Sequence, residues 1–223
     1  EGFLKPDEKR EEGPFGEFTG HYGGLKMPRP TIHLTALTRR KSPILHLAYQ
    51  GAPPHETDVL TAVGKESEIL RNITLAGVKS VHLTEGGCGV FHVVVAIDKL
   101  YEGYGKMVGL AIFGSPPGRH IKQVTVVDDD IDPFNPAEVE WAAATRVQPH
   151  RDIEIMTGLT GIFLDPSLPK EEQEGPARTS KILIDATRYD AKDFARVCLP
   201  ARDVMEKVDK DWDRYGIRKP TTQ

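Results

Sequence analysis

The sequence predicts an α/β fold with a mixed sheet for residues 77–190. Short valine-rich runs alternate there with segments whose apolar residues recur at helical spacing. Glycine, proline and aspartate separate these runs, as expected for turns. Together the patterns predict strands at 78–83, 90–97, 121–127, 151–156 and 181–184, and a helix at 104–113.

A second helix in this region has a clear start signal. Asn135 has the side chain of an N-cap, Pro136 occupies the first turn, and Glu138 follows three residues after the cap. This combination predicts a helix that begins at residue 136.

The first 76 residues follow a different pattern. Residues 1–30 are rich in glycine and proline and are expected to form loop with one short strand. Two strand-like runs, 31–37 and 43–49, flank a charged connection and predict a hairpin. Residues 56–75 have helical spacing and predict a linker helix, with a domain boundary near Ala76.

Two further segments lie later in the chain. Residues 166–177 are polar and contain proline, so we expect a loop there. Residues 203–215 place apolar side chains on one stripe and predict a last helix.

Composition narrows the function classes. The 223 residues are 39% hydrophobic and 28% charged, with a formal net charge of −4. This balance argues against nucleic acid as the main partner, because no strongly basic field is present to hold phosphates. No apolar run reaches the ~18 residues of a membrane span. Two cysteines are too few for a secreted disulfide framework, so the sequence predicts a cytoplasmic protein.

The densest candidate site lies at residues 12–20. Glu12 and Glu17 flank a Gly-Pro turn, with Phe15 and Phe18 beside them. Such a turn would aim both acids into one dry cavity, where burial and the neighbouring like charge would keep one of them protonated. That acid would be a proton donor near neutral pH. The alternative is a surface turn with two solvated glutamates.

Two other features each have two interpretations. The acidic run 128–132 follows a predicted strand, where clustered carboxylates suit Mg²⁺ or Ca²⁺ but also cap loops and helix starts. Lys122 opens the same strand, and its ammonium would either neutralise a phosphate or extend to the surface.

Four motifs together resemble the C-terminal half of the UbiD-family carboxy-lyases, decarboxylases that use prenylated FMN. They are EGPFGEFTGHYG at 12–23, VDDDID at 127–132, NPAEVEWAAATR at 135–146 and KILIDATRYD at 181–190. Their order and spacing cover nearly the whole chain.

The resemblance implies reversible non-oxidative decarboxylation of an aromatic or α,β-unsaturated carboxylic acid, with the flavin as electron sink. It gives Glu17 the role of proton donor and Glu12 that of its companion. It places Lys122 near the cofactor phosphate. The substrate pocket would be lined by Phe18, Leu164 and Pro166.

The resemblance also implies a domain organisation. Residues 1–50 would be a remnant of a split β-barrel flavin-binding domain, 51–76 the linker helix, 77–190 the C-terminal α/β domain, and 191–223 a C-terminal helix that makes oligomer contacts. A homo-oligomer, dimer or hexamer, is expected.

The family's Mn²⁺ and K⁺ would bind with prenylated FMN in a part of the fold upstream of residue 12. The expected partners are therefore an N-terminal flavin-binding half and a flavin prenyltransferase that supplies the cofactor. Alone, the chain is expected to be inactive. The alternative is a non-catalytic oligomerisation domain of a decarboxylase complex.

Overall fold

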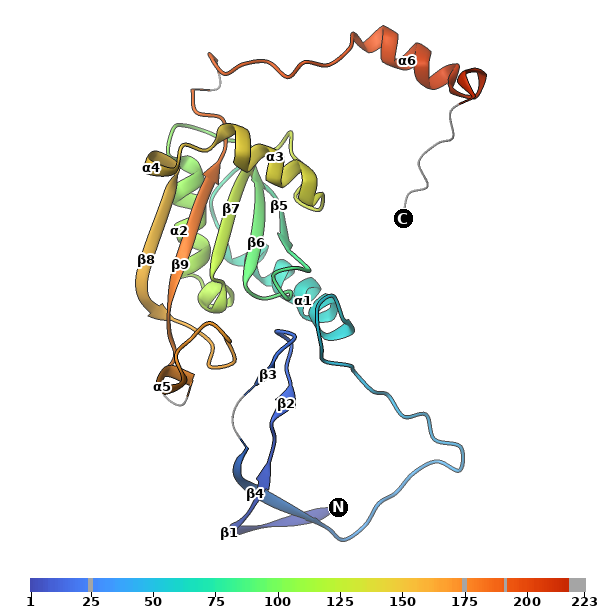
Figure 1. Ribbon diagram of the computed structural model, residues 1–223, viewed down its shortest axis with the longest axis vertical. Helices are drawn as coiled ribbons and strands as arrows, with labels where there is room; N and C mark the ends of the chain where they lie inside the picture. Colours follow the sequence, from blue (N-terminus) through green and yellow to red (C-terminus); the bar gives the residue numbers. More distant parts are fainter. Residues whose placement is uncertain (24–25, 174–175, 191, 217–223) are drawn as a thin grey trace. The chain divides into compact units, whose positions relative to one another are not determined.

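The computed structural model describes residues 1–23, 26–173, 176–190 and 192–216. The chain forms two compact units, Glu1–Tyr189 and Asp190–Gln223. The first unit contains a five-stranded sheet in the order β5-β6-β7-β9-β8 and two small two-stranded sheets (Figure 1).

The large sheet is mixed, which confirms the predicted fold class. Its three central strands, β6, β7 and β9, are parallel, and the two edge strands pair with them in the antiparallel sense. The strands are β5 (Val78–Leu83), β6 (His92–Ile97), β7 (Gln123–Asp128), β8 (Ile153–Thr160) and β9 (Arg178–Ala186).

Helices cover both faces of this sheet (Figure 1). One face packs against α1 (Glu56–Asn72) and α2 (Tyr104–Gly114), which is followed by the 3₁₀ helix η1 (Pro117–His120). The other face packs against α3 (Pro136–Arg146), and the short α4 (Pro149–Asp152) leads into β8. Successive residues of β6 point to opposite faces, so Val93 and Val95 face α2 while Val94 faces α3.

The predicted start of α3 is confirmed in detail. The Asn135 side chain accepts a hydrogen bond from the backbone N–H of Ala137 at 3.1 Å. The Glu138 carboxylate accepts one from the Asn135 amide at 3.0 Å and one from the Asp132 backbone N–H at 2.9 Å. These contacts satisfy donors that a helix start leaves open.

The N-terminal region differs from the sequence prediction. Residues 1–30, expected to be mostly loop, contain the eleven-residue strand β1 (Gly2–Glu12). It pairs with β4 (Met27–Leu34), so the predicted hairpin between 31–37 and 43–49 is wrong. Alternation reveals a strand but does not identify its partner.

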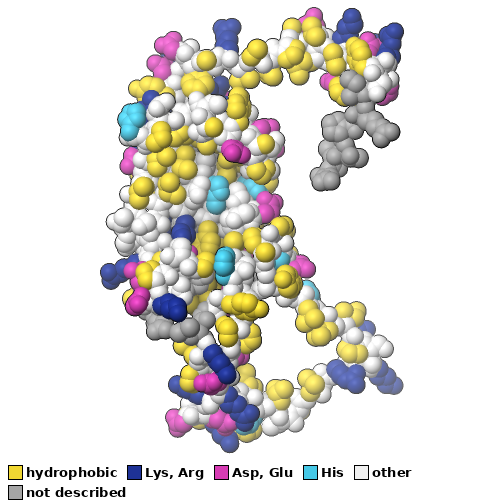
Figure 2. Space-filling model, in the orientation of Figure 1, with side chains coloured by type: hydrophobic (Ala, Val, Ile, Leu, Met, Phe, Trp, Pro, Cys, Tyr) yellow, Lys and Arg dark blue, Asp and Glu magenta, His cyan; other side chains and the backbone are white. Residues whose placement is uncertain are grey.

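Residues 43–49 have no regular secondary structure. Hydrophobic side chains of this segment are exposed to solvent; Ile44 is 87% exposed and Leu47 is 75% exposed. Figure 2 shows hydrophobic and basic side chains together along the stretch between β4 and α1.

The predicted loop 166–177 contains one helical turn, α5 (Lys170–Gln173), and its residues 174–175 lie outside the described chain. In the second unit, α6 (Arg202–Lys210) and the 3₁₀ helix η2 (Trp212–Tyr215) occupy the place of the predicted last helix. Of the expected segment 191–223, residues 191 and 217–223 are not described. Within the described ranges, no helix combines the length and apolar character needed to cross a membrane.

Candidate active-site turn

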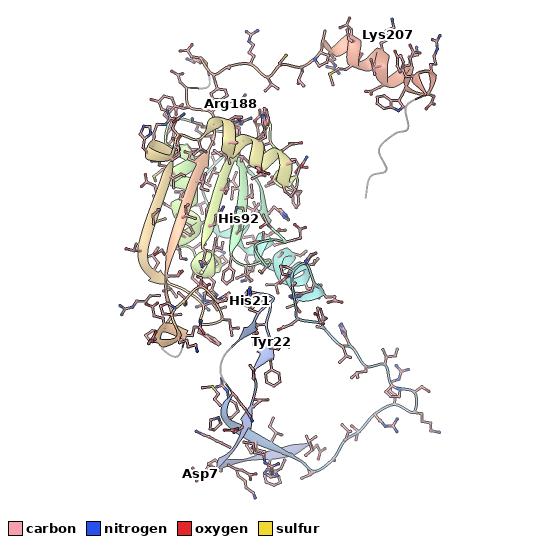
Figure 3. The ribbon with its side chains drawn as sticks, in the orientation of Figure 1. Asp7, His21, Tyr22, His92, Arg188 and Lys207 are labelled. Atoms are coloured by element: carbon pink, nitrogen blue, oxygen red, sulfur yellow. The ribbon has the colours of Figure 1, made fainter. Side chains whose placement is uncertain are left out.

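Glu17 lies in a tight turn between β2 (Phe15–Gly16) and β3 (Tyr22–Gly23). Its backbone N–H donates to the carbonyl of His21 at 3.0 Å, and its own carbonyl accepts from the Gly20 N–H at 2.9 Å. The Glu17 side chain is half-buried. Figure 3 shows His21 and Tyr22 where this turn leads into β3. The backbone therefore fixes the position from which the carboxylate projects.

Glycines allow neighbouring segments to approach the turn. A Cβ on Gly16 would lie 2.8 Å from the Gln50 carbonyl oxygen, and a Cβ on Gly23 would collide with the Glu17 side chain and lie 3.0 Å from Leu164 Cδ2. Residues without a side chain are needed here because backbone and side chains come so close. The structure thus brings Glu17 and Leu164, two of the predicted site residues, to the same place.

Phe18 and Lys122 both approach Phe91. The rings of Phe18 and Phe91 have centroids 5.5 Å apart, and the Lys122 Nζ lies 5.7 Å from the Phe91 centroid. Phe91 directly precedes β6, and Lys122 directly precedes β7. Two predicted site residues therefore lie beside one aromatic ring that the sequence analysis did not single out.

Lys122 is not free to act as an isolated charge. Its Nζ lies 2.7 Å from Asp165 Oδ2 and donates to Ser167 Oγ at 2.8 Å. Burial opposes ionisation of Asp165, but Lys122 and the hydrogen bonds from Ser167 outweigh it and lower the pKa of this carboxyl. The pair ties the start of β7 to the loop that carries Leu164.

The other two predicted site residues lie further out. Glu12 is the last residue of β1, opposite Met27, and its side chain is exposed. The expectation that the turn holds both acids in a dry cavity is therefore wrong for Glu12. Pro166 follows the buried Asp165, but its own side chain is exposed. The roles assigned to both residues stay predictions.

The sequence analysis missed a buried acid–base pair at the start of α1. The side chains of His55 and Asp58 are 2% and 1% exposed, and His55 Nε2 lies 3.5 Å from Asp58 Oδ2. Within the described chain, neither side chain has a hydrogen-bond partner. Burial raises the pKa of Asp58, against the opposing effect of His55.

The segment that leads to this pair passes the Glu17 turn. Gly20 of that turn would bring a Cβ within 2.9 Å of Ala52, three residues before His55. In the sequence, His55 directly follows two prolines and lies three residues before Asp58. This spacing predicts that the two side chains meet at the start of a helix.

A cavity of about 650 Å³ opens on the α3 side of the sheet. Phe91 and Lys122 belong to its lining. His92 lies within it, on β6 (Figure 3). The imidazole hydrogen-bonds Thr125 Oγ1 at 3.0 Å and Thr84 Oγ1 at 3.3 Å. Burial, and secondarily the neighbouring His82, lower the pKa of His92 to about 4.

Two aspartates of the acidic run 128–132, at the end of β7 and just after it, form ion pairs with arginines. Arg146 Nη1 lies 2.7 Å from Asp128 Oδ2 and 3.0 Å from Asp130 Oδ1, and Arg188 Nε lies 3.2 Å from Asp128 Oδ2. Among the described residues there is no group of three or more side chains able to hold a metal ion. The Mg²⁺ or Ca²⁺ interpretation is therefore not supported, because arginines already neutralise these carboxylates.

The structure thus holds a half-buried glutamate on a tight turn, and the next residue, Phe18, contacts Phe91 in the lining of a cavity. The chain belongs to the UbiD family of 3-octaprenyl-4-hydroxybenzoate carboxy-lyases. Residues 1–53 match the family's Rift-related domain, and residues 58–186 match its C-terminal domain.

The chain is similar to decarboxylases that are named for different substrates. It is 42% identical over 189 residues to an anhydromevalonate phosphate decarboxylase of Methanocaldococcus jannaschii, covering 84% of this chain and 42% of that protein. It is 33% identical to a phenolic acid decarboxylase of a Streptomyces species, covering 94% and 43%. The chain thus spans less than half the length of these relatives.

Solved structures show the same fold. The UbiD-class enzyme HmfF from Pelotomaculum thermopropionicum, solved with FMN, is 36% identical, with a TM-score of 0.77 and coverage of 93% of this chain and 45% of that one. An evolved dimeric form of HmfF, solved with prenylated FMN, is 35% identical, with a TM-score of 0.69 and coverage of 91% and 42%.

Proposed function

We propose that this chain supplies the proton donor, Glu17, for reversible non-oxidative decarboxylation of an aromatic or α,β-unsaturated acid by a UbiD-type enzyme. The observation that carries the proposal is the fixed turn that places Glu17 and Leu164 on either side of Gly23 and packs Phe18 on Phe91. The active unit would include the N-terminal portion that the relatives have and this chain does not represent.

Each of these residues has a proposed part in the reaction. After CO₂ leaves, the Glu17 carboxyl donates a proton to the carbon left behind, a contribution of about 10²–10⁴ in rate. Phe18 and Leu164 exclude water from that carbon. Prenylated FMN, when bound, supplies the electron sink for the reaction.

The fit to the cofactor is partial. Lys122 is a cation of the right type for the flavin phosphate, but it would have to share its ammonium with Asp165. Glu12 is exposed and would act as companion only if the N-terminal portion covers it. Because the described residues contain no cluster for a metal, we assign the ligands of Mn²⁺ and K⁺ to that N-terminal portion.

We propose that the cavity beside Phe91 receives the carbon skeleton of the substrate. Lys122, already paired, is the only Lys or Arg in its lining, which also contains Glu85 and Glu140. His92 has a pKa of about 4 and is neutral at pH 7. A phosphate would meet more negative than positive charge here, so a neutral ring with hydroxyl groups fits better.

The test is CO₂ release by this chain co-expressed with the N-terminal portion and a flavin prenyltransferase. Vanillic acid and anhydromevalonate phosphate serve as the aromatic and the phosphorylated substrate. Glu17→Gln should lose about 10²–10⁴ in rate, whereas Glu11→Gln, at an exposed residue paired with Lys26, should not. Equal rates for both variants would reject the catalytic assignment and favour the non-catalytic oligomerisation domain.

We also propose that α6 makes homo-oligomer contacts. Val204 and Met205 on this helix are 48% and 44% exposed, and with the exposed Tyr215 of η2 they offer apolar surface that a second copy would cover. Light scattering should show that Met205→Lys lowers the oligomeric mass, while Lys207→Gln on the same helix leaves it unchanged. A wild-type monomer at micromolar concentration would contradict this proposal.

A further inference from the structure

A second pocket, of about 580 Å³, lies between α1 and η1. Three basic side chains line it: Lys65 and Arg71 on α1, and Arg119 on η1. His120 completes the basic side, and Glu68 is the only carboxylate in the lining. The pocket therefore has an excess of positive charge in a protein whose formal net charge is −4.

Glu68 partly offsets the positive charge of the cations in this pocket, but within the described structure it forms no ion pair with them. Among the described residues, no carboxylate within 4 Å forms an ion pair with Lys65, Arg71 or Arg119, whereas other lysines of this unit have such a partner, as Lys106 has in Glu154. Cations held together without an anion repel each other, and a bound anion relieves that repulsion.

The pKa values of Lys65 and His120 are both lowered in this pocket, in part by the other positive charges. Burial lowers the pKa of Lys65, and Arg119 lowers it further against the effect of Glu68. Burial lowers the pKa of His120 too, followed by the charges of Arg119, Lys65 and Lys181. An anion in the pocket would favour the charged form of both groups.

The η1 side of the pocket is held rigidly. Ser115 Oγ donates to the Ile112 carbonyl at 2.7 Å and accepts from the Gly118 N–H at 3.2 Å. The buried Lys181 donates to the Arg119 carbonyl at 2.6 Å. Because these contacts anchor the backbone on both sides of Arg119, its guanidinium and the His120 ring project from a fixed platform.

The α1 side is fixed by helix geometry. Glu68 lies three residues after Lys65, and Arg71 and Asn72 lie three and four residues after Glu68, so these side chains share one face of the helix. Arg119 offers a planar fork of donors suited to phosphate oxygens, and Lys65 offers a compact charge. When His120 is protonated, the lining has an excess of three positive charges, which is more than a single phosphate of about −1.5 to −2 charge neutralises.

We propose that this pocket binds a small molecule with two linked phosphate groups. Lys65 and Arg119 contact the phosphate oxygens, Arg71 adds charge, and His120 takes up a proton on binding. The site is separate from the Glu17 turn and does not depend on the decarboxylase function.

Isothermal titration calorimetry of the 223-residue chain with inorganic pyrophosphate at physiological salt tests the proposal. The Lys65→Gln/Arg119→Gln variant removes two charge-assisted contacts and should bind about 100-fold more weakly. The control variant Lys79→Gln/Arg202→Gln loses the same charge at exposed positions elsewhere and should bind as the wild type does. Matching urea midpoints for the two variants would show that folding is intact.

The proton uptake gives a second readout. Pyrophosphate should raise the pKa of His120 in a ¹H–¹³C NMR titration, and affinity should increase as pH falls through that range. The groups that face His120 are Arg119 on its own element, Lys65 and Glu68 on α1, and Lys181 on β9. Equal binding by both double variants, no shift of His120, or tighter binding of single-stranded RNA than of pyrophosphate would each overturn the proposal.

Discussion

The half-buried imidazole of His92 should make the stability of this chain depend on pH between about 4 and 6.5. Its pKa is lowered from 6.5 to about 4 by burial and by His82. Between these pH values, His92 is protonated in the unfolded chain but not in the folded chain. The free energy of unfolding therefore rises with pH, and the contribution of His92 is complete above about pH 6.5. As pH falls toward 4, this contribution is lost.

The size of the effect follows from the pKa difference. One pKa unit corresponds to about 1.4 kcal/mol, so the shift of His92 is worth about 3 kcal/mol over the whole window. That is a large fraction of the 5–15 kcal/mol that stabilises an average domain.

Urea unfolding followed by tryptophan fluorescence at pH 7.5 and at pH 4.5 measures this difference. Other groups also titrate in this range, so the comparison is between the wild type and His92→Gln, whose amide retains hydrogen-bonding groups but does not titrate. When the pH is lowered from 7.5 to 4.5, the free energy of unfolding should fall by about 3 kcal/mol less in the variant than in the wild type. His46→Gln, at an exposed position, should behave as the wild type does. An unchanged pH dependence in His92→Gln would refute the reasoning.

Three further substitutions test the packing of the α/β domain by the same unfolding assay. Arg146→Met removes a buried partner of Asp128 and should cost about 3–5 kcal/mol, with part recovered when Asp128→Asn is added. Asn135→Ala removes the cap of α3 and should cost about 1 kcal/mol; no loss would show that the cap is not needed. Gly109→Ala places a Cβ against the buried Leu183 and should cost about 1–3 kcal/mol, whereas a stabilised variant would contradict the close packing.

Local signals in the sequence were sufficient for the α/β domain. Strands β5, β6 and β7 are short runs that contain two or three valines each, β8 and β9 are rich in isoleucine and leucine instead, and α3 begins where Asn135, Pro136 and Glu138 predict it. Such signals act between residues that are neighbours along the chain. The β1–β4 pairing joins Gly2 to Leu34, and no local pattern specifies a partner so far away.

The candidate site was predictable to a similar extent. The glycines and the proline near Glu17 predict a turn, but Gly13 and Pro14 lie before β2, and the turn that holds Glu17 comes after it. The family resemblance names Leu164, and its part in a substrate pocket stays a prediction. Two features were not visible. The burial of His55 and Asp58 depends on packing at α1, and the exposure of Glu12 depends on the two-stranded ribbon in which it lies. Both are properties of the assembled fold.

The distribution of charge along the parallel strands explains where the functional groups lie. In open α/β sheets, ligands usually bind at the carboxyl ends of the strands. Here the carboxyl end of β7 is occupied by ion pairs, because Arg146 and Arg188 neutralise Asp128.

Phe91 and Lys122, in contrast, stand directly before the amino ends of β6 and β7, where the Phe18 ring and the loop of Asp165 meet them. At the carboxyl edge of this sheet, ion pairs to Asp128 thus connect α3 with the segment that follows β9. The amino edge is left to receive the Glu17 turn, and the chemistry that we propose for this chain belongs at that edge.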